Sequence, residues 1–136
     1  MTIAKPKKNR APLNLLMGLV GLVAICLSVV AANLEWRAPV QLLSMFIVMI
    51  SLTTMFLTRK SDEYTLGLWS TSANAAFATV IFVVLFGAFG EAIYDGIMVA
   101  IYQVEHEREV DGDLAAILAL YAFFLTFNIK RLLGAF

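Results

Sequence analysis

The sequence predicts an all-α, polytopic membrane protein with four transmembrane helices, forming a single membrane domain over residues 1–136. Three observations predict this fold class. Apolar residues make up 61% of the chain, against roughly 45–50% in soluble domains. Charged residues make up only 15%, and the mean hydropathy is +0.85. The apolar residues are also gathered into four uncharged segments.

The same composition excludes several classes of protein. So high an apolar fraction is typical neither of a water-soluble domain nor of a disordered chain. The single cysteine, Cys26, excludes a disulfide scaffold. Ten basic and ten acidic residues give a net charge of zero, which excludes a nucleic-acid binder.

The positions of the spans follow from length and charge. A helix needs about 20 mostly apolar residues to cross a hydrocarbon core about 30 Å thick. The first two expected spans follow Pro12 and Pro39, because proline suits the first turn of a helix. The last is extended by Lys130 and Arg131, whose apolar stems let their charges reach the interface. The expected spans are residues 13–34, 40–57, 70–90 and 114–129.

The first span also resembles a secretory signal peptide. A basic start precedes it, and Val30-Ala31-Ala32 could serve as a cleavage site. However, its apolar run of about 20 residues is longer than the roughly 7–15 of a signal peptide. We therefore interpret it as a retained membrane anchor.

The orientation follows from the basic residues. Eight of the ten lie in the N-terminal tail, the loop over residues 58–63 and the C-terminal end. With four spans these places fall on one side of the membrane, and an excess of Lys and Arg marks the cytoplasmic side. The sequence thus predicts a multi-pass protein of the bacterial inner membrane with both termini in the cytoplasm.

The end of the third span has two interpretations. A straight helix from Asp62 to Val104 would be about 65 Å long, twice the membrane thickness. Gly87 and Gly90 favour a bend, after which residues 91–113 form an amphipathic and acidic segment along the outer membrane surface. The alternative is a third helix that continues rigidly into the outer compartment. We favour the bend.

Acidic side chains dominate this outer segment. Glu91 and Asp95 are four residues apart, so they share one face of a helix. Such a pair could relay protons, bind a cation or receive a basic partner, or it could simply be solvated. Residues 105–113 carry a formal charge of −4. This run is either a solvated loop or a docking surface for a basic soluble protein, with contacts at Glu105, Glu107 and Glu109.

Metal and cofactor chemistry has little support. His106, the single histidine, could ligate a divalent metal together with Glu105 and Glu109. A zinc site normally needs more than one His or Cys, and a calcium loop supplies more oxygen ligands at regular spacing. No span has an ionisable residue at its centre, where the coupling site of a transporter lies. We therefore predict no metal site, no cofactor, no catalytic residues and no enzymatic activity.

Small residues recur at helical spacing in the first and third spans. Such stripes let neighbouring helices approach closely. We expect helix packing at the glycines and other small residues of both stripes, namely Gly18, Gly21, Ser28, Ala76, Gly87 and Gly90.

The loop between the second and third spans reads Arg59-Lys60-Ser61-Asp62-Glu63-Tyr64-Thr65, followed by Leu68-Trp69. This run resembles a motif of small bacterial inner-membrane proteins, in which an Asp-Glu pair opens the helix after a two-helix hairpin. The resemblance implies no particular activity. Acidic residues are also expected here physically, because they favour the positive end of the helix dipole, and Ser61 or Asp62 could cap the helix.

Two functions fit these observations. The first is a non-catalytic accessory or structural subunit of a larger inner-membrane complex, of respiratory or photosynthetic type. Its partners would be membrane lipids, other membrane subunits and a basic soluble protein on the outer face, but no nucleic acid. The alternative is a homo-oligomeric channel or transporter for ions or small solutes, with Glu91 and Asp95 at its mouth. A third possibility, an enzyme acting on lipids or quinones, is disfavoured because the sequence offers no paired nucleophile and general base.

Overall fold

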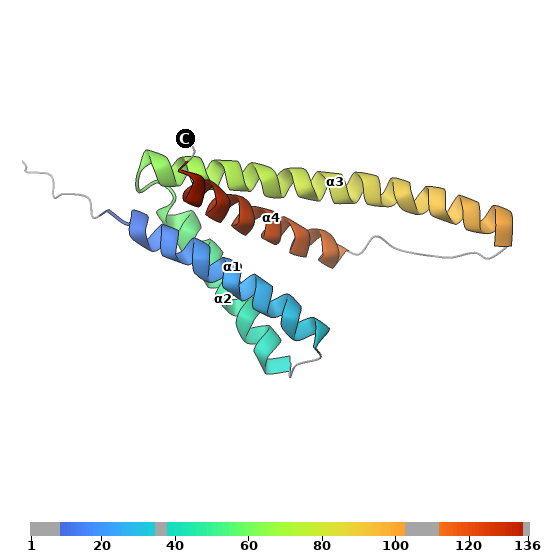
Figure 1. The fold of residues 1–136 in the computed structure, drawn as a ribbon, viewed down its shortest axis with the longest axis horizontal. Coiled ribbons are helices and arrows are strands. Elements are labelled where there is room, and N and C mark those ends of the chain that lie inside the picture. The colour runs from blue at the N-terminus through green and yellow to red at the C-terminus, as the bar shows by residue number, and fades with distance from the viewer. Residues whose placement is uncertain (1–8, 35–37, 103–111, 135–136) are drawn as a thin grey trace, which may run out of the picture.

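A computed structural model describes residues 9–34, 38–102 and 112–134 (Figure 1). These residues form four helices and no strand. Each helix is long and apolar enough to cross a membrane, which confirms the predicted number of candidate spans. The helices are α1 (Ala11–Asn33), α2 (Ala38–Thr58), α3 (Glu63–Tyr102) and α4 (Gly112–Leu133).

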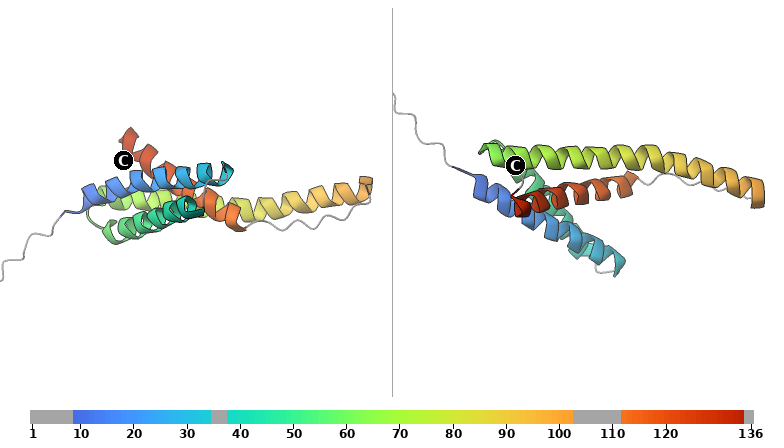
Figure 2. Two further views of the ribbon diagram at one scale, coloured as in Figure 1. Left: turned by 90° about the horizontal axis from the view of Figure 1, so that it is seen from below. Right: turned by 45° about the horizontal axis from the view of Figure 1, so that its top comes forward.

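The helices are arranged as two antiparallel hairpins, α1–α2 and α3–α4. Within each hairpin the two helices pack along much of their shared length, whereas the hairpins are joined mainly through α1 and α4. They meet at the end where α1 and α3 begin and where α2 and α4 end, here called the junction end. From there the hairpins diverge (Figures 1 and 2).

The α1–α2 hairpin is held by a regular seam of small side chains. Buried residues of α2 follow one another at steps of four and three, the repeat of a left-handed coiled coil. From α1, Asn14 reaches this seam and donates to the Met55 carbonyl and to Thr58 Oγ1. On α2 the seam consists of Ser44, Val48, Ser51, Met55 and Thr58.

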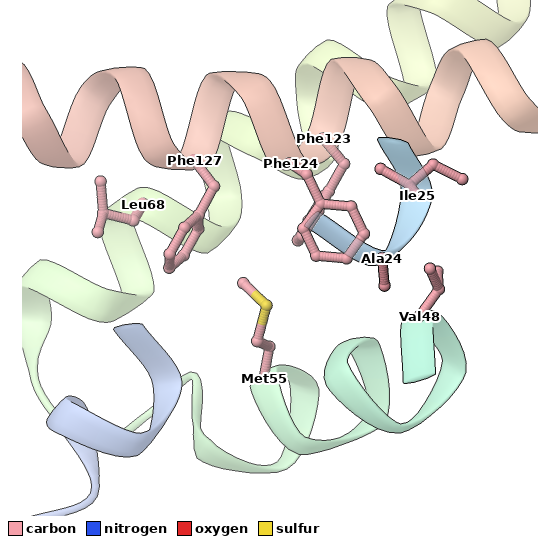
Figure 3. Packing of buried hydrophobic residues seen from close by; sticks show 8 residues of the cluster. All are labelled: Ala24, Ile25, Val48, Met55, Leu68, Phe123, Phe124 and Phe127. Atoms are coloured by element: carbon pink, nitrogen blue, oxygen red, sulfur yellow. The ribbon is translucent and has the colours of Figure 1, made fainter. Parts of the chain in front are cut away.

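The core lies near the junction end, where side chains of all four helices meet (Figure 3). Phe124 and Phe127 of α4 are fully buried and press against two glycines of α1. A Cβ atom at Gly18 would overlap the Phe127 ring, and one at Gly21 would overlap the Phe124 ring. The two glycines are therefore what allows α1 and α4 to pack face to face.

The prediction of a bend near Gly90 is wrong. Helix α3 continues without interruption from Glu63 to Tyr102, so its 40 residues rise about 60 Å. A glycine inside a helix costs about 1 kcal/mol relative to alanine but does not end it when neighbouring residues keep helical geometry. Among the described glycines a positive φ occurs at Gly134, after α4, and not at Gly90. Residues 91–102 thus extend α3, and residues 103–111 of the predicted segment lie outside the described residues.

Candidate functional site

The motif between α2 and α3 forms a reciprocal helix cap. The Thr65 backbone N–H donates to Asp62 Oδ1 at 2.7 Å, and the Asp62 N–H donates to Thr65 Oγ1 at 3.4 Å. Thr65 Oγ1 also donates to the Arg59 carbonyl at 3.2 Å. This exchange satisfies backbone donors that the first turn of α3 leaves unpaired. Asp62 is therefore the capping residue, and the conspicuous run of the sequence has a local structural role.

Buried amides connect the helices at the junction end. Asn14 Nδ2 donates to the Met55 carbonyl and to Thr58 Oγ1, both at 2.8 Å, and so ties α1 to α2. Asn128 Nδ2 donates to the Gly18 carbonyl at 2.9 Å and to the Phe124 carbonyl at 2.8 Å, and so ties α4 to α1. Hydrogen bonds of this kind between membrane helices contribute about 0.6–2 kcal/mol each.

Basic side chains at the same end are bound to neutral groups. Arg131 Nη1 donates to the Leu15 carbonyl at 2.9 Å, and Lys130 Nζ donates to Thr71 Oγ1 at 2.8 Å. The Arg59 guanidinium lies 3.8 Å from the centre of the Phe56 ring. Among the described residues none of these three cations is paired with a carboxylate, so their positive charge can attract anions near the junction end.

The structure places the two predicted small-residue stripes differently. Gly18, Gly21 and Ser28 are buried against neighbouring helices. On α3, Ala76 packs against the core, whereas Gly90 is exposed and a Cβ atom there would meet nothing within 4 Å. Gly87 is half-buried. The stripe of α3 is therefore packed at Ala76, partly covered at Gly87 and uncovered at Gly90 within the described chain.

The predicted acidic residues fall on the far part of α3 or beyond it. Glu91 and Asp95 are half-buried, and Asp95 Oδ1 has no hydrogen-bond partner in the described part of the chain. Glu105, His106, Glu107 and Glu109 lie outside the described residues. Within the described ranges no three His, Cys, Asp or Glu side chains gather as metal ligands would.

The far half of α3 contrasts with the rest of the bundle. This half comprises residues 83–102, and no residue from 83 to 101 is buried, although Leu85, Phe86 and Phe89 are large and apolar. Nothing in the described part of the chain covers these three side chains. The same three side chains line a hollow of about 330 Å³.

Two places can therefore act on other molecules: the cationic junction end and the uncovered half of α3. No family model, curated protein or solved structure matches this chain. The function is accordingly argued from the chemistry of these two places.

Several of these features were missed in the sequence. Ser44, Ser51 and Thr58 are seven residues apart, and this spacing could have indicated the seam of α2. Asn128 stands one turn before Arg131 in the apolar fourth span, so both could have been assigned to one helix face. Their partners on α1 depend on how α4 docks, which no local pattern reveals.

Proposed function

We propose that this chain is a non-catalytic structural subunit of a larger complex in the bacterial inner membrane, of the respiratory or photosynthetic kind. The observation that carries the proposal is the unbroken length of α3, 40 residues. In this proposal the chain spans the membrane four times with both termini in the cytoplasm. The cationic junction end then lies at the inner surface, in keeping with the bias of its basic residues.

The position of the membrane on α3 follows from the rise of a helix. From Trp69 to Gly90, α3 rises about 32 Å, close to the thickness of about 30 Å of the hydrocarbon core. Glu91 then stands at the outer boundary. The next residues, 91–102, here called the outer arm, reach about 17 Å beyond it. Because α3 does not bend at Gly90, the outer arm cannot lie down on the membrane surface.

The outer arm carries exposed apolar side chains where lipid tails do not reach. Tyr94, Ile97 and Ile101 are spaced three and four residues apart and are 47–65% exposed. Leaving apolar surface in water costs about 25 cal/mol per Å², so a protein partner that covers this face gains free energy. Glu91 and Asp95 lie beside it and favour a basic partner. The outer arm thus has the chemistry of a docking element.

The junction end supports the same role by fixing the chain at the inner surface. The positive side chains of Arg59, Lys130 and Arg131 are held in place by neutral partners. Each such charge gains about 1 kcal/mol near anionic lipid headgroups. A chain anchored in this way at one surface presents the outer arm at a fixed height above the other.

The proposal is tested by purifying the tagged chain in mild detergent and identifying bound proteins by mass spectrometry. We expect other membrane subunits to be recovered with it. A variant with Tyr94→Gln and Ile101→Gln should recover about tenfold less of them, since two lost apolar contacts of about 1 kcal/mol each weaken binding by at least that factor.

The matched control has Leu132→Gln and Leu133→Gln, two exposed apolar residues at the junction end. This variant should recover the subunits like the unmodified chain. Purification of the chain as an oligomer without other proteins would contradict the proposal. It would favour instead the channel or transporter with Glu91 and Asp95 at its mouth.

A further inference from the structure

A second exposed stripe runs along α3, separate from the face formed by Tyr94 and Ile101. Its members follow one another at alternating steps of four and three residues. With 3.6 residues per turn, all of them lie within about 40° of one line along the helix. This is the repeat of a helix that winds around another in a left-handed coiled coil. The α3 seam consists of Phe82, Phe86, Phe89, Ile93, Gly96 and Ala100, all of them exposed.

The surface of this seam has the shape that a neighbouring helix needs. In a coiled coil each side chain of one helix enters a hole formed by residues i, i+3, i+4 and i+7 of the other. Phe82, Leu85, Phe86 and Phe89 have this spacing, and the last three line the hollow of about 330 Å³. The rings of Phe82 and Phe86 stack with centres 4.6 Å apart.

We propose that the occupant is α3 of a second copy of this chain, packed in parallel along the α3 seam. The first three members lie at membrane depth, but Ile93, Gly96 and Ala100 lie in the outer arm. Lipid tails can cover only the first group. A single partner helix that covers the whole seam must be apolar at the same depth and must continue about 15 Å beyond the membrane. The symmetry-related α3 satisfies both conditions, because a two-fold axis along the membrane normal brings each residue to its own counterpart.

Charge and side-chain size favour the same pairing. Glu91 and Asp95 lie about 140–180° around the helix from Phe82, so the carboxylates of two parallel copies point away from each other. Like charges therefore do not oppose the contact. Gly96 and Ala100 are small, and a Cβ atom at Gly96 would meet nothing within 4 Å in the single chain. Two outer arms can consequently approach closely at these positions.

This inference shares with the proposed function only the position of the membrane. Tyr94 and Ile101 lie about 100–120° around the outer arm from the line of the α3 seam, and Ile97 lies between the two. A dimer of the chain can therefore still bind other subunits through the second face.

The test is disulfide cross-linking in native membranes. In a Cys26→Ser background, single cysteines replace Ile93, Gly96 or Ala100 in the seam, and Glu91, Asp95 or Met98 on the opposite side. A disulfide requires Cα atoms within about 7 Å, so after oxidation we expect about tenfold more covalent dimer at the seam positions. In addition, two differently tagged copies should co-purify, and Ile93→Glu should abolish this while Met98→Glu should not.

Three results would overturn the dimer. Dimer yields could be equal on both sides of the helix, the differently tagged copies could fail to co-purify, or the seam cysteines could cross-link to a protein of another mass. The last result would leave the proposed function intact. Conversely, seam-specific dimers that carry no other subunit would establish the dimer and remove the accessory role.

Discussion

The junction end and the far half of α3 differ in how their surfaces are partnered. At the junction end Asn14 and Asn128 are buried and donate to backbone carbonyls of other helices. On the far half of α3, phenylalanine and isoleucine side chains are exposed, with nothing of the described chain over them. The first region holds the two hairpins together by its own contacts. The second is complete only when lipid or another protein covers it.

The difference indicates which substitutions act within the chain and which act between chains. A change at the junction end should alter the stability of the purified protein. A change on the far half of α3 should leave stability nearly unchanged and alter assembly instead. The comparison would fail if both kinds of change had the same effect on unfolding.

The largest effect is expected for Gly21→Leu. Even a Cβ atom at this position would overlap the buried Phe124 ring, so a leucine must push α4 away from α1. Overpacking of this kind costs about 1–3 kcal/mol or more, and here it also breaks the contact that joins the hairpins. We expect little folded protein in membranes and a lowered thermal midpoint in detergent.

Leu22→Ala is the matched control, because Leu22 is the next residue and is only half-buried. It should reduce the midpoint much less than Gly21→Leu. Equal tolerance of the two changes would mean that this face of α1 does not contact α4.

A smaller effect is expected for Asn128→Leu. Leucine is close to asparagine in size but removes the hydrogen bonds to the Gly18 and Phe124 carbonyls. The free energy of unfolding should fall by about 1–2 kcal/mol, as for other hydrogen bonds between membrane helices. Chemical or thermal unfolding in detergent measures this. Asn74→Leu, at an exposed position of α3, should leave the unfolding free energy unchanged.

The sequence was most informative where a local pattern decides the structure. Hydropathy located all four helices, because about 20 apolar residues suffice to identify a span. The spacing of Gly18, Gly21 and Ser28 indicated the face of α1 that the structure buries. The acidic start of α3 was expected to cap that helix, and Asp62 does so. In each case the responsible residues are neighbours in sequence.

The sequence was least informative where distant parts of the chain decide the structure. The bend at Gly90 was expected from glycine content and from the thickness of the membrane, but helix continuity depends on backbone geometry, which glycine permits. The donors Asn128 and Arg131 were not linked to α1, because their partners lie more than 100 residues away in sequence. The Phe-rich α3 seam was hidden by the uniform hydrophobicity of the third span.

The smallest effect is expected for Asp95→Asn, which tests the far half of α3. Asp95 Oδ1 is shielded from solvent without a hydrogen-bond partner in the described chain, so the carboxyl group loses hydration without compensation. A neutral amide loses less hydration free energy at this position. The free energy of unfolding of the purified chain should therefore rise by about 0.5–1 kcal/mol. Glu91→Gln, on the same face, is the control and should change it by less.

The sign of the effect decides the interpretation. A fall in stability on Asp95→Asn would show that the carboxylate already has a stabilising partner within the chain, and the far half of α3 would then resemble the junction end. A rise that disappears when the chain is purified with its bound subunits would place that partner on another protein, as the contrast between the two regions requires.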